Sequence, residues 1–267
     1  FDGPLQGVTT PATTPALRYA QAVYERPNSF VRAYWNRWDF NSDLLTHPLI
    51  DNFLRITNRD FSRTTSHSAD SYNIEAQHAV NLGMAHHVIF GFNYRHNALS
   101  SSLIGGFLRE DRLGFYLQDE WKPIRKITVI AGARYDLDTF INPTISPRAA
   151  LLYNPTPDHT FRVGVSVAYR PPTLNETAFD SRIQAILPPP IPLPPVIISR
   201  GSENLHPEEI VSYEAGYQGW YFKHRLRLRT NLFFNHISDL ITPTFPRPIQ
   251  GGEADIYGGE AGVEFLA

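Results

Sequence analysis

The sequence predicts an all-β protein, an antiparallel up-and-down transmembrane β-barrel, in which residues 1–267 form one domain and an incomplete segment of about eleven strands. Three features predict this class: segments of alternating apolar and polar residues, connections that are short and long in turn, and aromatic residues at both ends of the segments. Aromatic residues make up 13% of the chain and charged residues 19%, which suits a β-rich protein with aromatic belts.

The alternation is clearest between residues 159 and 170. Successive side chains of a strand point to opposite faces, so this segment has one apolar face and one polar or small face. The apolar set is Phe161, Val163, Val165, Val167 and Tyr169, and the other set is Arg162, Gly164, Ser166, Ala168 and Arg170. We expect the first face to meet lipid and the second to meet an aqueous interior.

Similar alternation between turn signals predicts about eleven strands along the chain. Their ranges are 17–25, 29–39, 70–81, 86–96, 112–122, 126–138, 146–154, 159–170, 208–221, 224–236 and 255–265.

The connections between these segments alternate in length. Tight turns are expected at 26–28, 83–85, 123–125, 155–158 and 222–223, and the longer connections are 40–69, 97–111, 139–145, 171–207 and 237–254. A transmembrane barrel has short periplasmic turns at one rim and long extracellular loops at the other, whereas a β-sandwich has no reason to alternate so regularly. The pattern favours the barrel.

Aromatic residues collect at both ends of the expected strands. Tyr94, Tyr135 and Tyr169 lie toward the long loops, and Trp121, Tyr153 and Tyr221 lie toward the tight turns. Two interfacial girdles would produce this distribution, and the surface of a sandwich would not.

The strand count and the chain ends predict a part of a larger barrel. Bacterial single-chain barrels usually have an even number of strands, and an unpaired strand edge is not tolerated in hydrocarbon. About half of a 22-stranded, plugged transporter would account for the count. The first residues, FDGPLQGVTT, have neither a basic region nor an apolar core, so we expect any export signal to lie upstream.

Several function classes have no support. The net charge of −2 and the lack of a basic tract argue against nucleic-acid binding. The chain has no cysteine, and its 10 histidines show no metal-ligand spacing. No nucleophile elbow, carboxylate pair or phosphate-binding glycine loop is present, so we expect no enzymatic step, no cofactor and no resident metal.

Four segments, in this order, resemble the TonB-dependent outer-membrane receptors. They are FYLQDEWKP at 115–123, AGARYD at 131–136, the hairpin at 142–176 with its SPR, NPTPDHT and RPPTLNE runs, and ENLHPEE at 203–209 leading into YEAGY at 213–217. The resemblance implies an outer-membrane receptor for active uptake of a scarce small molecule such as a ferric siderophore or cobalamin. It also implies outer-membrane lipid and the TonB complex as partners. The chain contains no plug-like or TonB-contacting sequence, so that coupling is assigned to none of its residues.

Six arginines are expected to line the lumen. They are Arg134, Arg148, Arg162, Arg225, Arg227 and Arg229. They could attract an anionic ligand, because guanidinium binds carboxylate and phosphate bidentately. The structural alternative, which we favour, is pairing with acids of adjacent strands or of a plug, and the acids available in this chain are Glu214, Asp136 and Glu120.

The connection 171–207 is the second candidate region. Its run LPPPIPLPP at 187–195 predicts stiff polyproline II and a semi-rigid lid over the barrel mouth. The polar residues beside it are Arg170, Asn175, Glu176 and Asn204, which we expect to contact the ligand.

Two other classes remain open at this point. One is a plug-free passive porin or an outer-membrane adhesin. The other is a soluble extracellular β-sandwich binding module, in which Phe161, Val163, Val165 and Val167 would lie between two sheets.

Overall fold

The computed structural model describes residues 9–11, 15–44, 64–101, 106–178, 180–183, 196–202, 204–242, 244 and 247–266. Within these ranges the chain forms one 12-stranded antiparallel sheet, a separate two-stranded hairpin and one short helix. In the part of the chain that the structure describes, no helix is long and apolar enough to cross a membrane.

The strands of the large sheet are β1 (Thr9–Pro11), β2 (Ala16–Arg26), β3 (Ser29–Leu44), β4 (Thr64–Leu82), β5 (His86–Ser101), β6 (Gly106–Ile124), β7 (Ile127–Asp138), β8 (Thr144–Thr156), β9 (His159–Arg170), β12 (Glu208–Tyr221), β13 (Leu226–Thr242) and β14 (Ile249–Phe265). The hairpin consists of β10 (Asp180–Ile183) and β11 (Val196–Arg200), and the helix is α2 (Leu174–Ala178).

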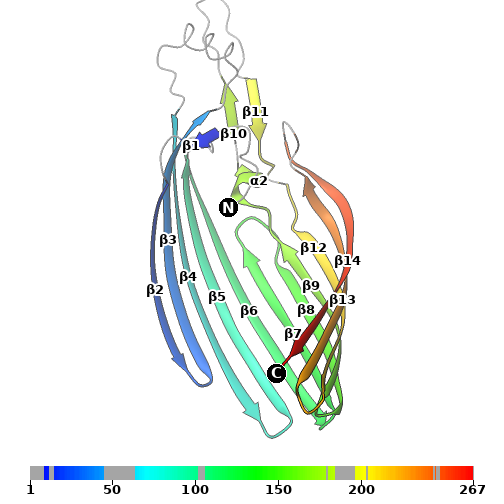
Figure 1. Ribbon diagram of the computed structural model, residues 1–267. Helices are drawn as coiled ribbons and strands as arrows, with labels where there is room; N and C mark the ends of the chain where they lie inside the picture. Colours follow the sequence, from blue (N-terminus) through cyan, green and yellow to red (C-terminus); the bar gives the residue numbers. More distant parts are fainter. Residues whose placement is uncertain are drawn as a thin grey trace, which may run out of the picture.

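Each long strand pairs with the next along the chain, and β9 pairs directly with β12 (Figure 1). The short β1 and the long β2 both pair with β3, at different heights, so they share one edge of the sheet. No pairing among the described residues joins β2 to β14, and the sheet is therefore an open wall. The expectation of an incomplete, up-and-down barrel segment with eleven long strands is confirmed.

Local chemistry explains the tight turns. Gly83 has a φ of +67°, a conformation that glycine adopts without the steric cost that other residues meet. The turn before β13 is less usual, because Phe222, Lys223 and His224 have φ values of 53°, 57° and 65°. Three successive left-handed residues reverse the chain within one short connection, as the alternation of loop lengths predicts.

The two faces of the sheet differ as the sequence predicts. Directly paired residues of antiparallel strands lie on the same face. Val165 pairs with Ala149 and Tyr213, while its neighbour Gly164 pairs with Ala150 and Glu214. The apolar residues of neighbouring strands thus form one continuous face, and the polar residues form the other.

Burial identifies the polar face as the concave one. The buried polar side chains of the described residues all belong to it, and they are His67, Asn73, Ser101, Glu110 and Gln118. On the opposite face Val163 remains 52% exposed, because no second sheet covers it in the described part of the chain. The sandwich alternative is therefore wrong, and the concave face is the lumen wall.

Glycines on the concave face make room for large polar side chains. A Cβ atom at Gly91 would lie 2.5 Å from the Tyr116 hydroxyl oxygen, so the phenol ring occupies the space that a larger residue would need. A Cβ atom at Gly114 would meet the Arg134 guanidinium in the same way. The side chains of Tyr116 and Arg134 lie across the neighbouring strand for this reason.

The apolar face ends in aromatic and charged residues at the outer rim. Trp35 Nε1 donates to Asp70 at 2.9 Å, and the Tyr94 hydroxyl donates to Asp111 at 2.7 Å. On the convex face of β6, Asp111 and Asp119 lie eight positions apart, about 27 Å along the strand at roughly 3.4 Å per residue, with Leu113, Phe115 and Leu117 between them. With a strand tilt of about 40°, this length spans about 21 Å along the barrel axis, most of an apolar band about 25 Å tall.

Several strands are longer than the sequence predicts. The expected loop 97–111 is wrong over most of its length, because β5 continues to Ser101 and β6 begins at Gly106. The outer ends of β3, β4, β13 and β14 likewise extend into the expected loops 40–69 and 237–254. Alternation of apolar residues stops where lipid stops, but strand pairing continues into water because it satisfies the backbone hydrogen-bonding groups.

Candidate ligand-facing site

The base of the connection 171–207 is fixed by ion pairs at the outer rim. Arg170, the last residue of β9, donates to Glu208 at 2.7 Å and to Glu176 at 3.3 Å. Glu208 also accepts a hydrogen bond from the Ile241 backbone N–H at 2.8 Å. One guanidinium thus ties the start of the loop to the strand that follows it, and through Glu208 to β13.

A capping box explains why α2 begins where it does. The Thr173 hydroxyl accepts the Glu176 N–H at 3.2 Å, and the Glu176 carboxylate accepts the Thr173 N–H at 2.7 Å. These reciprocal bonds satisfy two backbone donors that a helix start leaves unpaired. The Glu176 carbonyl accepts the Ser202 N–H at 2.9 Å, so the returning half of the loop is held at the same place.

The ion pair between Arg170 and Glu208 shifts the pKa of both residues. They lie one residue beyond Tyr169, above the apolar band and outside the membrane-spanning part of the sheet. Hydrogen bonds from Arg170 lower the pKa of Glu208, and they outweigh burial, which raises it. The same contact raises the pKa of Arg170. Both groups stay charged at neutral pH.

Three apolar residues at the loop base are buried. Leu205 and Ile241 are each 7% exposed, and Pro172 is also buried. The Gln250 side chain accepts the His206 N–H at 2.8 Å and donates to the His206 carbonyl at 2.7 Å. The loop base is therefore a packed structure on the outer ends of β9, β12, β13 and β14, and Figure 1 shows β10 and β11 rising beyond it.

The four predicted contact residues have different environments. Arg170 and Glu176 lie together in the ion-pair cluster, and Asn204 is an exposed turn residue on the returning half of the loop. Asn175 lies in α2, but its side chain is outside the described residues, as is the predicted polyproline segment 187–195. Ligand contact by these residues stays a prediction. Sequence reasoning missed Glu208 as a partner of Arg170. It also missed the capping box of α2, although the Thr-x-x-Glu spacing of Thr173 and Glu176 is visible in the sequence.

Five of the six lumen arginines have side-chain partners, which lie on the same strand, the adjacent strand or the strand beyond it. Arg162 pairs with Glu214 at 2.7 Å, and Arg134 pairs with Asp136 at 2.7 Å. The other contacts are Arg227 with Glu264 at 3.4 Å and with Gln218 at 2.8 Å, Arg229 with Glu264, and Arg148 with Gln118. Arg225 lies in the turn before β13 and has no side-chain partner among the described residues. Pairing of Arg162 with Glu214 of the adjacent strand follows the expectation. Asp136 is also paired, but with Arg134 of its own strand, and no described ion pair involves Glu120.

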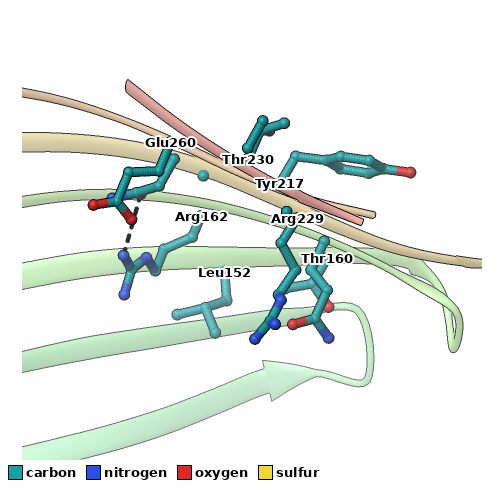
Figure 2. Close-up of a pocket in the computed structure, with 12 residues that line it drawn as sticks. Leu152, Thr160, Arg162, Tyr217, Arg229, Thr230 and Glu260 are labelled. Carbon is teal, nitrogen blue, oxygen red and sulfur yellow. Dashed lines mark hydrogen bonds between the residues drawn. The ribbon is translucent and has the colours of Figure 1, made fainter. Parts of the chain in front are cut away.

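A hollow of about 570 Å³ lies on the concave face between β8 and β14. Figure 2 shows Arg162, Arg229 and Glu260 around it, and Arg162 also donates to Asn231 at 3.5 Å. The other concave-face residues of the lining are Leu152, Thr160, Gly216, Gln218 and Gly262. Arg162 and Arg229 are each paired with a carboxylate, Glu214 and Glu264, so the hollow is lined by fixed charges of both signs, which suits a polar neighbour.

No group of three or more histidine, aspartate or glutamate side chains in the described ranges could hold a metal ion. Several imidazoles instead contact single carboxylates: His86 lies 2.7 Å from Asp119, and His236 lies 2.8 Å from Asp255.

An open wall with an apolar convex face, a polar concave face and aromatic borders defines a segment of a transmembrane barrel of the outer-membrane type. The chain belongs to the family described as TonB dependent receptor-like, beta-barrel, whose model matches residues 8–266. This family is located in the outer membrane and consists of transport receptors rather than enzymes.

Solved receptors share the fold at low identity. The siderophore receptor PirA from Acinetobacter baumannii is 14% identical with a TM-score of 0.64, and the match covers 93% of this chain and 42% of PirA. A variant of the ferric enterobactin receptor PfeA from Pseudomonas aeruginosa is 14% identical with a TM-score of 0.65, covering 92% and 41%. The FrpB iron transporter from Neisseria meningitidis is 13% identical with a TM-score of 0.67, covering 95% and 42%.

The chain therefore spans less than half the length of these three receptors. No curated protein sequence matches it.

Proposed function

We propose that residues 1–267 are part of the barrel domain of an outer-membrane TonB-dependent receptor that takes up a scarce small molecule, such as a ferric siderophore or cobalamin. The protein contacts outer-membrane lipid through the convex face and the TonB complex through a plug domain that this chain does not contain. It performs no enzymatic step and binds no nucleic acid.

The observation that supports this function most is the concave wall. Five of its arginines are held by carboxylates and amides of the wall itself, and two of them border an open hollow. A wall that only enclosed water would not need this density of fixed charge, whereas a wall that contacts a polar ligand or plug would use it for orientation. The solved receptors named above support the choice of siderophore or iron as the first ligands to test.

The test uses the complete open reading frame that contains this chain. A strain that depends on this gene is grown with iron supplied only as single ferric siderophores, and separately with cobalamin as the limiting vitamin. We expect growth on at least one source, and loss of that growth when either this gene or TonB is deleted. Uptake that continues without TonB would indicate a passive porin and contradict the proposal.

A further inference from the structure

The ladder between β8 and β9 ends before the two strands do. Its outermost pair is Arg148 with Ser166, although β8 begins at Thr144 and β9 continues to Arg170. Between the other long strands of the described sheet, the pairing comes within one residue of the outer end of at least one strand. We call the part outside the ladder the seam and define it as residues 144–147 and 167–170.

A proline explains why the ladder ends there. The backbone groups of successive residues in a strand point alternately to its two neighbours. The Asn154 N–H donates to the Lys126 carbonyl of the β7 side at 2.7 Å, so the odd-numbered residues of β8 face β9. Pro147 therefore faces β9, but it has no N–H to donate to Val167 opposite it. Pro171, which follows β9 directly, also has no N–H.

The seam lies at the outer edge of the apolar band. Ile145 is 57% exposed on the convex face and pairs with Tyr135 of the outer aromatic border, to which Tyr169 also belongs. In the middle of the seam the concave face carries only Ser146 and Ala168, whose side chains are too short to cover the boundary. Water from the lumen can therefore reach the unpaired backbone groups, which hydrocarbon alone could not satisfy.

Each side of the seam is held by its other neighbour. β8 pairs with β7 as far as Thr144, and β9 pairs with β12 as far as Arg170. The Arg170 side chain donates to Glu208, which fixes β9 to the loop base rather than to β8. Among the residues that the structure describes, no ion pair or side-chain hydrogen bond joins residues 144–147 to residues 167–170. Separation of the two sides would therefore disrupt little else in the wall.

We propose that the seam is a lateral opening in the wall, through which an acyl chain of an outer-leaflet lipid reaches the concave face. Hydrocarbon fits this boundary because Ile145, Pro147 and Val167 present apolar groups on the convex face. An added peptide strand fits it less well, because Pro147 and Pro171 lack the backbone donors that strand addition uses. The inference goes beyond the proposed uptake and is independent of the ligand.

The test measures contact between lipid and a fluorophore on the concave face. The complete receptor, with any cysteine elsewhere replaced by serine, receives Ala168→Cys, is labelled with bimane and is placed in phosphatidylcholine vesicles with brominated or ordinary acyl chains. Bromine quenches a fluorophore only on contact, so we expect brominated lipid to lower the intensity of this label. Pro147→Val in the same protein supplies the missing N–H and extends the ladder, and it should remove most of that loss.

Two positions on the same strand are the matched controls. Gly164→Cys places the label on the concave face where the ladder is closed, and a Cβ atom there meets no atom closer than 3.5 Å. Val165→Cys places it on the convex face. We expect no quenching at 164, full quenching at 165 and an intermediate loss at 168. Resistance of each variant to denaturation in sodium dodecyl sulfate checks that the barrel has formed.

Two outcomes of the quenching experiment would overturn the inference. In a folded receptor, a label at Ala168→Cys that is quenched no more than one at Gly164→Cys would show that the boundary stays closed to lipid. Quenching that persists unchanged after Pro147→Val would show that lipid reaches the label by a route other than the seam.

Hydrogen exchange gives an independent measurement. The Trp220 N–H donates to the Asp158 carbonyl at 2.9 Å, so the even-numbered residues of β9 face β12 and the odd-numbered ones face β8. After correction for intrinsic rates, the Tyr169 amide should exchange about tenfold faster or more than the Val165 amide, which lies inside the ladder, and Pro147→Val should slow it. Equal protection of the two amides would contradict the inference. Both measurements use the receptor without ligand or TonB, so they do not depend on the growth assay.

Discussion

Replacing Val165 with arginine tests the assignment of the convex face to lipid. Val165 lies on that face of β9, four residues from Phe161 and four from Tyr169, which is about 14 Å along the strand in each direction. At a strand tilt of about 40° it lies near the middle of the apolar band, where an arginine costs about 2–4 kcal/mol of folding free energy.

Ala150→Arg is the control at the same depth. Ala150 pairs with Gly164, the residue before Val165, so its side chain points to the concave face with space beside it. Arginine there meets water, and we expect a cost of about 0.5 kcal/mol or less. Guanidinium-dependent folding of the complete receptor into lipid vesicles, followed by tryptophan fluorescence, gives both free energies. Equal losses for the two variants, or a larger loss for Ala150→Arg, would refute the assignment of faces.

The remaining predictions concern the outer rim and one close contact on the concave face. Glu208→Gln removes a charged partner of Arg170 and weakens the bond to the Ile241 amide, so we expect that amide to exchange hydrogen about tenfold faster, as measured by mass spectrometry. The pKa of Glu208 is lowered in the folded state, so its stabilisation is complete above the ordinary value of 4.5 and is lost as the pH falls through the lower folded value. Exchange at Ile241 should therefore accelerate below about pH 4.5 in the parent, after correction for intrinsic exchange, and show less of this dependence in Glu208→Gln. Gly91→Val should destabilise the folded barrel by about 1–3 kcal/mol, because the new Cβ would lie 2.4 Å from the Ala76 carbonyl oxygen and 2.5 Å from the Tyr116 hydroxyl oxygen. Tyr116→Ala in the same protein should recover the part of the loss that is due to the phenol and leave the part that is due to the backbone.

The sequence was sufficient to predict the faces of most strands, because lipid imposes an apolar residue at every second position. It was sufficient for the orientation of Arg134 and Arg162 for the same reason, and for their pairing with the nearby acids Asp136 and Glu214. These predictions depend on local periodicity and on short distances between adjacent strands.

Other features depend on information that periodicity does not contain. The outer ends of β5 and β6 have no apolar alternation because they pair in water, so the expected loop between them was too long. Glu208 is 38 residues from Arg170, and only the direct pairing of β9 with β12 brings them together.

The pairing of β9 with β12 also has an evolutionary consequence. Arg170 and Glu208 are direct partners in the ladder, so residues 171–207 leave the sheet and return to it at the same rung. An insertion, deletion or exchange in this excursion alters neither the stagger nor the tilt of the strands. Selection by antibodies, phages or competing nutrients can therefore remodel this exterior segment rapidly, and a protein engineer can graft a foreign peptide there, while the ion pairs at its base preserve the junction.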